Sequence, residues 1–282
     1  MKLLKDILRG VVIGIANAIP GVSGGTMMVS MGIYDNIIYC VTHLFSQFKK
    51  SVMTLLPYAV GMAVGIVGLA YFIKALYANV PFQTSMLFIG LILGGVPILT
   101  EKFKGKKLGV PHVAVFFIFF VAIICMQYFG GNGKDVSLTL DVLSLIKLFF
   151  IGVIASATMV IPGVSGSMML MILGYYNPII NSITDLVSGL VAGDWQTVLR
   201  ICGVLIPFGL GIVVGIFAIA KLIEILLKKY EALTYCAIMG LVISSPVVIL
   251  MSTALGALSA ASVITGILAL AVGAGIALCL GK

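Results

Sequence analysis

Residues 20–27 read PGVSGGTM, and residues 162–169, 142 positions later, read PGVSGSMM. The wider windows 20–38 and 162–180 are identical at ten of nineteen positions. Both motifs place helix-breaking proline and glycine inside apolar sequence, where an interrupted helix leaves backbone groups that must find other partners. Paired interruptions at corresponding places in two halves of a chain indicate the binding site of a membrane transporter.

The composition around the motifs is that of a membrane protein. The chain of 282 residues is 61% hydrophobic and 9% charged, against about 25% charged residues in soluble domains. Several apolar stretches approach the roughly 20 residues that span a hydrocarbon core, namely 52–73, 113–129, 203–220 and 256–280. We therefore predict an all-α polytopic membrane protein. Its net charge of +8 lies in short loops and indicates topology rather than nucleic-acid binding.

The internal repeat continues beyond the motifs at an offset of 150 residues. The matched pairs are Pro57 with Pro207, Gly61 with Gly211, Gly65 with Gly215, Ala70 with Ala220, Thr84 with Thr234, and Gly90-Leu91 with Gly240-Leu241. The change of offset from 142 to 150 predicts an eight-residue insertion between 181 and 199. The sequence thus predicts one transmembrane domain, 1–282, made of two repeats, 1–135 and 136–282.

Each repeat predicts the same order of elements. A short apolar segment (10–19 or 150–161) precedes the motif, and a second short helix (24–38 or 166–180) follows it. Ten helical residues cover about 15 Å, half of a roughly 30 Å core, so the motif forms a re-entrant hairpin in this prediction, although 142–161 is long enough to cross. Three longer segments complete each repeat: 52–78, 83–99 and 112–129, then 201–227, 233–251 and 256–280.

Lysine and arginine placement sets the predicted orientation. With both termini in the cytoplasm and six crossing segments, 13 of the 17 basic residues lie inside, as the positive-inside rule requires of short loops. Three crossings per repeat make the two repeats inverted relative to each other. The two motifs then enter from opposite sides and meet near the bilayer midplane.

The chemistry of the motifs suits an anion. Ser23 and Ser165 stand where they can cap the following helix, whose free N–H groups favour negative charge, and Thr26 and Ser167 add hydroxyls. A phosphate or a carboxylate is the expected ligand. The competing interpretation is that small residues only allow close helix packing and the serines cap their own helices.

The predicted substrate-binding residues are the two motifs and the polar residues just before them. Asn17 fits either a substrate contact or a hydrogen bond between helices. Arg9 and Arg200 are candidate charge partners for a phosphate, with anchoring at the membrane interface as the alternative. The full candidate set is Asn17, Pro20, Gly21, Val22, Ser23, Gly24, Gly25, Thr26, Thr158, Pro162, Gly163, Val164, Ser165, Gly166 and Ser167.

The sequence does not favour catalysis. Neither motif contains an acid, a histidine or a cysteine, so the serines have no general base beside them. The five cysteines lie singly, without the spacing of a metal site or a disulfide framework. We predict a carrier with no catalytic residues, metal or cofactor. Coupling to an ion or a proton stays open, because no proton carrier stands out.

These residues resemble the polyprenyl-phosphate transporter (PopT) family over nearly the whole chain. The resemblance rests on residues 16–26 with the Gly32-Ile33-Tyr34 that follows, and on residues 159–167 with Gly174-Tyr175-Tyr176. Many members of the family carry Asp where this chain has Asn17, which leaves open a charge-dependent role at that position.

The resemblance implies an undecaprenyl phosphate translocase in a bacterial or archaeal cell (inner) membrane. Such a protein returns the lipid from the outer to the cytoplasmic leaflet, where the carrier is used again in cell-envelope synthesis. Two alternatives remain: a secondary transporter of a small soluble anion, and a membrane-embedded polyprenyl-diphosphate phosphatase. A cavity that opens sideways to lipid would distinguish the first alternative, and acid and base groups beside the serines would support the second.

Overall fold

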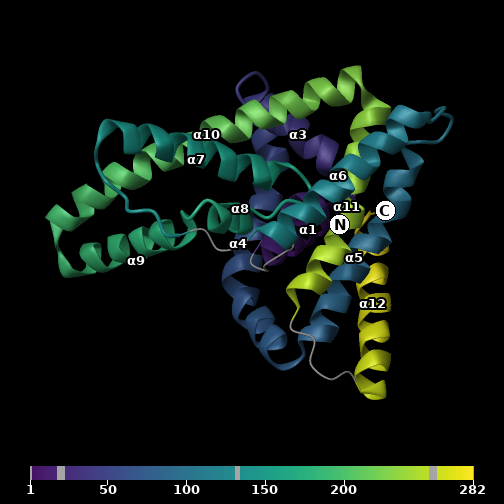
Figure 1. Ribbon diagram of the computed structural model, residues 1–282. Coiled ribbons are helices and arrows are strands. Elements are labelled where there is room, and N and C mark those ends of the chain that lie inside the picture. The colour runs from purple at the N-terminus through teal and green to yellow at the C-terminus, as the bar shows by residue number, and fades with distance from the viewer. Residues whose placement is uncertain (1, 18–22, 131–133, 254–258, 282) are drawn as a thin grey trace.

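The computed structural model describes residues 2–17, 23–130, 134–253 and 259–281, apart from a few side chains in 67–74. Every regular secondary-structure element in these ranges is a helix (Figure 1). The helices are α1 (Lys2–Asn17), α2 (Gly24–Ser30), α3 (Tyr34–Thr42), α4 (Phe48–Asn79), α5 (Pro81–Glu101), α6 (Val110–Phe129), α7 (Val142–Val160), α8 (Gly166–Ile172), α9 (Tyr176–Ala192), α10 (Trp195–Lys229), α11 (Glu231–Ser252) and α12 (Ala260–Gly281).

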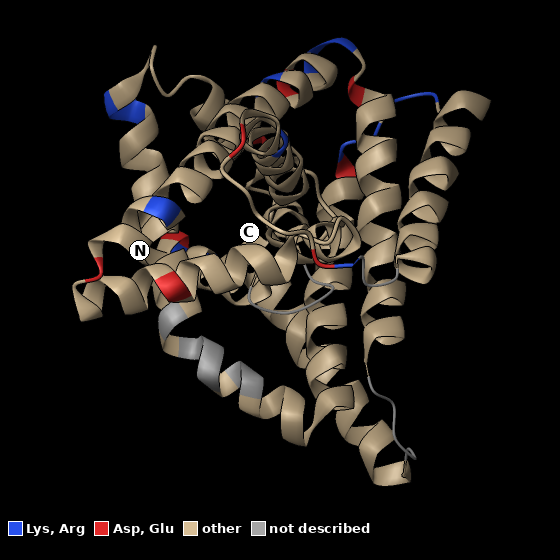
Figure 2. Cartoon of the chain, turned by 60° about the vertical axis from the view of Figure 1, so that its left-hand side comes forward, with Lys and Arg blue, Asp and Glu red and all other residues tan. Residues whose placement is uncertain are grey.

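The predicted all-α membrane protein is confirmed. Among the described residues, six helices are long and apolar enough to cross a membrane: α5, α6, α7, α10, α11 and α12. Long stretches of helix carry no charge, and most charged residues gather in the upper part of the view in Figure 2. Because α7 is one of the six, the segment before the second motif has the length of a crossing helix rather than of a re-entrant one.

Close pairs of helices recur at matching positions in the two predicted repeats. In α4 packed on α1, a Cβ on Gly61 would lie 2.1 Å from the carbonyl oxygen of Ile7. In α10 packed on α7, a Cβ on Gly211 would lie 2.0 Å from the carbonyl oxygen of Phe149. Only glycine allows backbones to approach this closely, so the glycines that match at offset 150 have a packing role.

The last helix of each half packs on the other half. Helix α12 lies on α5, where a Cβ on Gly90 would meet the carbonyl oxygen of Leu270 at 2.0 Å. Helix α6 lies on α11, where a Cβ on Gly240 would meet the carbonyl oxygen of Phe116 at 2.3 Å. The halves thus exchange helices in a matched way. Their inverted orientation in the membrane stays a prediction.

The helix that follows each motif is shorter than predicted. The segments 24–38 and 166–180 are each broken in two, by Gly32 at φ +67° and Gly174 at φ +76°. A positive φ is the left-handed conformation that glycine adopts at little cost, and both glycines belong to the ten shared positions. We call α2 with α3 the first hairpin and α8 with α9 the second hairpin.

The predicted insertion is an extension of α9 rather than a polar loop. Helix α9 has 17 residues and α3 has 9, and the difference of eight equals the change in offset. The extension ends at Gly193, which has φ +71°, and at Asp194, whose side chain accepts the backbone N–H of Thr197. Helix α9 runs beside α10 and contacts it (Figure 1).

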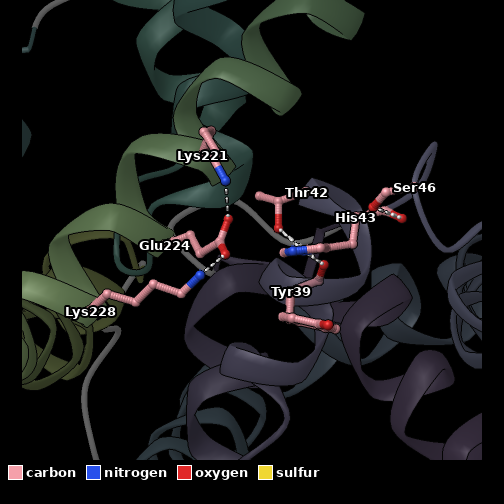
Figure 3. Close-up of polar contacts among 7 residues, drawn as sticks. All are labelled: Tyr39, Thr42, His43, Ser46, Lys221, Glu224 and Lys228. Atoms are coloured by element: carbon pink, nitrogen blue, oxygen red, sulfur yellow. Dashed lines mark hydrogen bonds and ion pairs between the residues drawn. The ribbon is translucent and has the colours of Figure 1, made fainter.

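The two hairpins are packed very differently. Helix α2 lies against α5 and α7, and α3 lies against α10, so the first hairpin contacts both halves. Figure 3 shows this α3–α10 contact, with Thr42 and His43 facing the Glu224 that Lys221 and Lys228 hold. Six of the seven residues of α2 are buried, whereas only Met168 is buried in α8. The packing of α8 is mainly against α7 and α9 of its own half.

Candidate functional site

The two motifs meet, although 142 residues separate them. The backbone N–H of Gly163 donates to the side-chain oxygen of Thr26 at 2.7 Å, and both groups are buried. A Cβ on Gly25 would lie 3.1 Å from the Cα of Pro162, so the backbones are nearly in contact. The hydroxyl of Tyr34 donates to the carbonyl oxygen of Val160, just before the second motif, at 3.1 Å.

The motif helices are capped in two different ways. The side chain of Ser23 makes no capping hydrogen bond, and Oδ1 of Asn17 accepts the N–H of Gly24 at 3.1 Å instead. Ser165 does cap its helix, because its hydroxyl accepts the N–H of Met168 at 3.5 Å, and it also lies 3.0 Å from the hydroxyl of Ser167. The prediction of a serine cap therefore holds for Ser165 and is wrong for Ser23, whose hydroxyl has no hydrogen bond to another described residue.

A cavity of about 660 Å³ lies beside the meeting point of the motifs. Seven predicted site residues line it: Asn17, Ser23, Thr158, Val164, Ser165, Gly166 and Ser167. Its volume falls in the usual range of about 300–1,000 Å³ for small-molecule sites. The cavity thus combines polar groups of both motifs, as a shared binding site requires.

The remaining wall of the cavity is apolar and reaches the surface. Ile66 of α4, Ile180 and Ile183 of α9, and Met159 of α7 line it and are 43–49% exposed. Hydroxyls and an amide therefore mark one part of the cavity, and exposed apolar side chains at the surface of the molecule mark another.

The other predicted site residues support the contact between the motifs. Gly24, Gly25, Thr26, Pro162 and Gly163 do not line the cavity, and each is buried in the packing around the turns. The Thr26 hydroxyl was predicted to bind the substrate. It accepts a hydrogen bond from the second motif instead, so its role in this structure is to hold the two motifs together. Pro20, Gly21 and Val22 lie outside the described residues.

Arg9 is not a cavity residue. Its guanidinium donates twice to the carbonyl oxygen of Leu280, at 2.6 and 2.9 Å, and pairs with Asp6 at 3.0 Å. Tyr58 also donates to Asp6, at 2.9 Å. This largely buried network joins α1, α4 and the end of α12, so a role as phosphate partner is not supported. The matched positions in the second half are apolar: Leu148, Ile151 and Phe208.

Arg200 lies on α10, away from the motifs but in a second, smaller cavity. This cavity of about 340 Å³ also contains Thr139, Ser182 and Asp185. None of the ion pairs and side-chain hydrogen bonds among the described residues involves Arg200. A hydrogen bond with Thr197 lowers the pKa of the nearby Asp194 carboxyl, with a smaller contribution from the charge of Arg200.

Sequence reasoning missed the aromatic and apolar part of the site. Tyr176 lines the cavity, and its partner in the repeat, Tyr34, bonds to the second motif. The signal was present, because these tyrosines are one of the ten identities between the two windows. The isoleucines of α9 could not be found in this way, because an apolar face of a membrane helix looks the same whether it meets lipid or lines a cavity.

Fold and site together define a polytopic helical membrane protein with one amphipathic cavity at two duplicated turns. A model of the VCA0040-like family, described as undecaprenyl phosphate translocase-like, matches residues 13–264, and the chain belongs to this family. It is 31% identical over 244 residues to a "Polyprenyl-phosphate transporter" of Staphylococcus aureus (strain NCTC 8325 / PS 47), covering 85% of this chain and 83% of the relative.

A second relative agrees with the first. The "Polyprenyl-phosphate transporter" of Vibrio cholerae serotype O1 (strain ATCC 39315 / El Tor Inaba N16961) is 25% identical over 259 residues, covering 87% of this chain and 77% of the relative. The family and both relatives carry the names of transporters rather than enzymes, so the chain is a membrane transporter. No solved structure matches the chain significantly.

Proposed function

We propose that this chain translocates undecaprenyl phosphate from the outer to the cytoplasmic leaflet, for reuse as a carrier lipid in cell-envelope synthesis. The observation that carries the proposal is the amphipathic cavity. Its polar part takes hydroxyls from both motifs, Ser23 from the first and Ser165 and Ser167 from the second. Its apolar part reaches side chains at the lipid boundary, so a phosphate head can bind inside while the long tail stays in the bilayer.

The head group is held by neutral donors in this proposal. The hydroxyls of Ser165 and Ser167 and the amide of Asn17 can donate to phosphate oxygens, and the N–H groups that begin α8 have no partner within the helix. The described lining contains no lysine or arginine. A site without a fixed cation binds a phosphate less tightly than one with an arginine, which suits a carrier that must also release its substrate.

The exposed apolar side chains in the cavity wall favour a lipid over a small soluble anion as the substrate. A soluble substrate needs a water-lined path, whereas Ile66, Ile180 and Ile183 offer the cavity an apolar boundary. The phosphatase alternative needs an acid and a base near the serines, and the described lining supplies no carboxylate and no histidine. The names of both relatives, polyprenyl-phosphate transporters, support the same substrate class.

The relation between the hairpins suggests how access alternates. The cavity opens beside the loosely packed second hairpin, while the first hairpin is buried between the halves. In an inverted repeat, exchanging these two packings would close the cavity on one side and open it on the other. We propose this exchange as the transport step. The distribution of lysine and arginine supports cytoplasmic termini, and the inward direction is the one that the family resemblance implies.

The test is a leaflet assay in proteoliposomes that carry labelled undecaprenyl phosphate. We expect the wild-type protein to move the lipid and the Ser23→Ala/Ser165→Ala double variant to lose at least about tenfold in rate, since two hydrogen bonds to a charged group are removed. Ser262→Ala is the matched control, because this partly exposed serine on α12 bonds to Ser259 and does not line the cavity. Uptake of inorganic phosphate without lipid movement would support the soluble-anion carrier, and equal rates in all variants would reject the site.

A further inference from the structure

The two cavities described above both border helix α10. On α10, Ile201 and Val204 line the smaller cavity and Phe208 and Ile212 line the larger one. Positions four apart lie on one face of a helix, so a single face of α10 runs from one cavity to the other. Arg200 stands at the end of this face, about 12 Å from Phe208 along the helix at 1.5 Å per residue.

Helix α9 also borders both cavities, but with different sides. Ser182 and Asp185 of α9 line the smaller cavity, and Ile179 and Ile183 line the larger one. Both cavities are therefore bounded by the same two helices, which contact each other. The smaller cavity lies toward the turn at Gly193, where the chain passes from α9 to α10.

The chemistry of the smaller cavity differs from that of the larger. It contains a guanidinium with no partner among the described residues, together with the hydroxyls of Thr139 and Ser182. A guanidinium offers two parallel N–H donors that match the oxygens of a phosphate. Arg9, the other arginine of the chain, has its donors occupied by Leu280 and Asp6, so Arg200 is the arginine available to a ligand.

We propose that the smaller cavity is a capture site for the phosphate monoester of the lipid substrate. Arg200 binds the head group in the smaller cavity, and the head then moves along this face of α10 to the hydroxyls of the larger cavity. The inference rests on the proposed function and adds to it a second binding site for the lipid head group. Asp185, in the same cavity, repels an anion and weakens its binding, so the head group stays at this site only briefly.

Substitutions at the two binding sites should change transport kinetics in different ways. Loss of Arg200 slows capture, so a higher lipid concentration is needed for half-maximal transport, while the maximal rate stays near that of the wild-type protein. Loss of the motif serines lowers the maximal rate itself. Because long-range attraction between charges is screened by salt, the concentration for half-maximal transport rises with salt in the wild-type protein and much less without Arg200.

The experiment measures transport against lipid concentration in proteoliposomes, at low and high salt. For Arg200→Ala we expect the half-saturating concentration to rise roughly fivefold to tenfold, as for loss of one charge-assisted contact at an accessible site. Asp185→Asn should lower it, and Lys229→Ala, an exposed cation at the other end of α10, should leave it unchanged. Thermal unfolding of each variant checks that the fold is intact.

Two results would overturn the capture site: an Arg200→Ala protein with wild-type half-saturation and salt dependence, or an Asp185→Asn protein that needs more lipid. Equilibrium binding of labelled undecaprenyl phosphate to the purified protein separates this proposal from the proposed function. If the wild-type protein moves no lipid, the proposed function fails. Binding that is equally tight with and without Arg200 then rejects the capture site as well, whereas binding weakened by Arg200→Ala retains it.

Discussion

The two hairpins carry the same motif and occupy opposite environments. The first hairpin is buried against helices of both halves, while the second borders the cavity and packs mainly within its own half. The difference shows at matched positions. Gly25 touches the backbone of Pro162, whereas its counterpart Ser167 carries a hydroxyl into the cavity. One copy of the motif thus supplies contact between the halves, and the other supplies most of the polar cavity lining.

A second matched pair explains why only one hairpin is tightly packed. A Cβ on Gly95 of α5 would lie 2.2 Å from the Cα of Ser30 at the end of α2. The position that corresponds at offset 150 is Ser245 of α11, which is buried and donates to Leu241 of its own helix. Glycine lets α2 sit directly on α5. Serine occupies that space on α11, and α8 makes no comparable contact there.

Gly95→Ser is expected to have the largest effect on stability. It places in the first half the residue that the second half has at the matched position. The added side chain would overlap backbone atoms of α2, which cannot move without disturbing the contact between the motifs. We expect a loss of stability of about 3 kcal/mol, at the upper end of the usual range for overpacking. Thermal unfolding in detergent measures it.

Gly275→Ser in α12 is the control, because a Cβ there meets nothing within 4 Å. It adds the same side chain to a similar helix and should unfold within a degree or two of the wild-type protein, since exposed substitutions change stability by about 0.5 kcal/mol or less. A Gly95→Ser protein as stable as this control would show that α2 does not rest on α5 in the working protein.

Thr26→Val tests the hydrogen bond that joins the two hairpins. Valine keeps the shape of the side chain but leaves the buried N–H of Gly163 without an acceptor, which costs about 1–3 kcal/mol. Thr184→Val on α9 is matched, because that exposed hydroxyl bonds only to carbonyl oxygens of its own helix. Equal melting temperatures for the two variants would mean that the motifs are not held together through Thr26.

The sequence predicted the helical membrane fold, because long apolar stretches give a clear signal, and the helix breakers within them directed attention to the two motifs. The inverted repeat and the binding role of the motif residues stay predictions. It could not separate Ser167 from Thr26, one facing the cavity and one joining the motifs, since hydroxyls of either role look alike. The breaks at Gly32 and Gly174 were also missed, although both glycines are shared by the windows. Their positive φ depends on how each hairpin turns in space, which periodicity does not encode.

Charge was the least predictable part of the site. Arg9 and Arg200 had equal standing as phosphate partners in the sequence, and both lie near predicted membrane edges. The difference arises from contacts across the chain, because Arg9 meets the carbonyl of Leu280, which is 271 residues away. A partner so far along the chain cannot be predicted from the residues around Arg9. Arg200 has no comparable partner among the described residues.

Asn17 should have the smallest effect on stability and separates capping from substrate binding. Asn17→Ala removes the acceptor for the N–H of Gly24 and should cost about 1 kcal/mol, as for other helix caps. Asn17→Asp keeps an acceptor, and its negative charge is favoured by the start of α2 but disfavoured by the end of α1, whose last residue it is. These effects oppose each other, so stability should stay within a few tenths of a kcal/mol. In the cavity, however, the same carboxylate would face the phosphate.

We therefore expect Asn17→Asp to be as stable as the wild-type protein while needing more lipid for half-maximal transport, and Asn17→Ala to be less stable with a smaller change in transport. Thermal unfolding and the leaflet assay, run on the same preparations, measure both. If Asn17→Asp transports like the wild-type protein, the head group does not approach Asn17, and the first hairpin contributes to the site only through Ser23 and its contact with the second motif. The second hairpin would then bind the phosphate largely alone, and the first copy of the motif would have a mainly structural role.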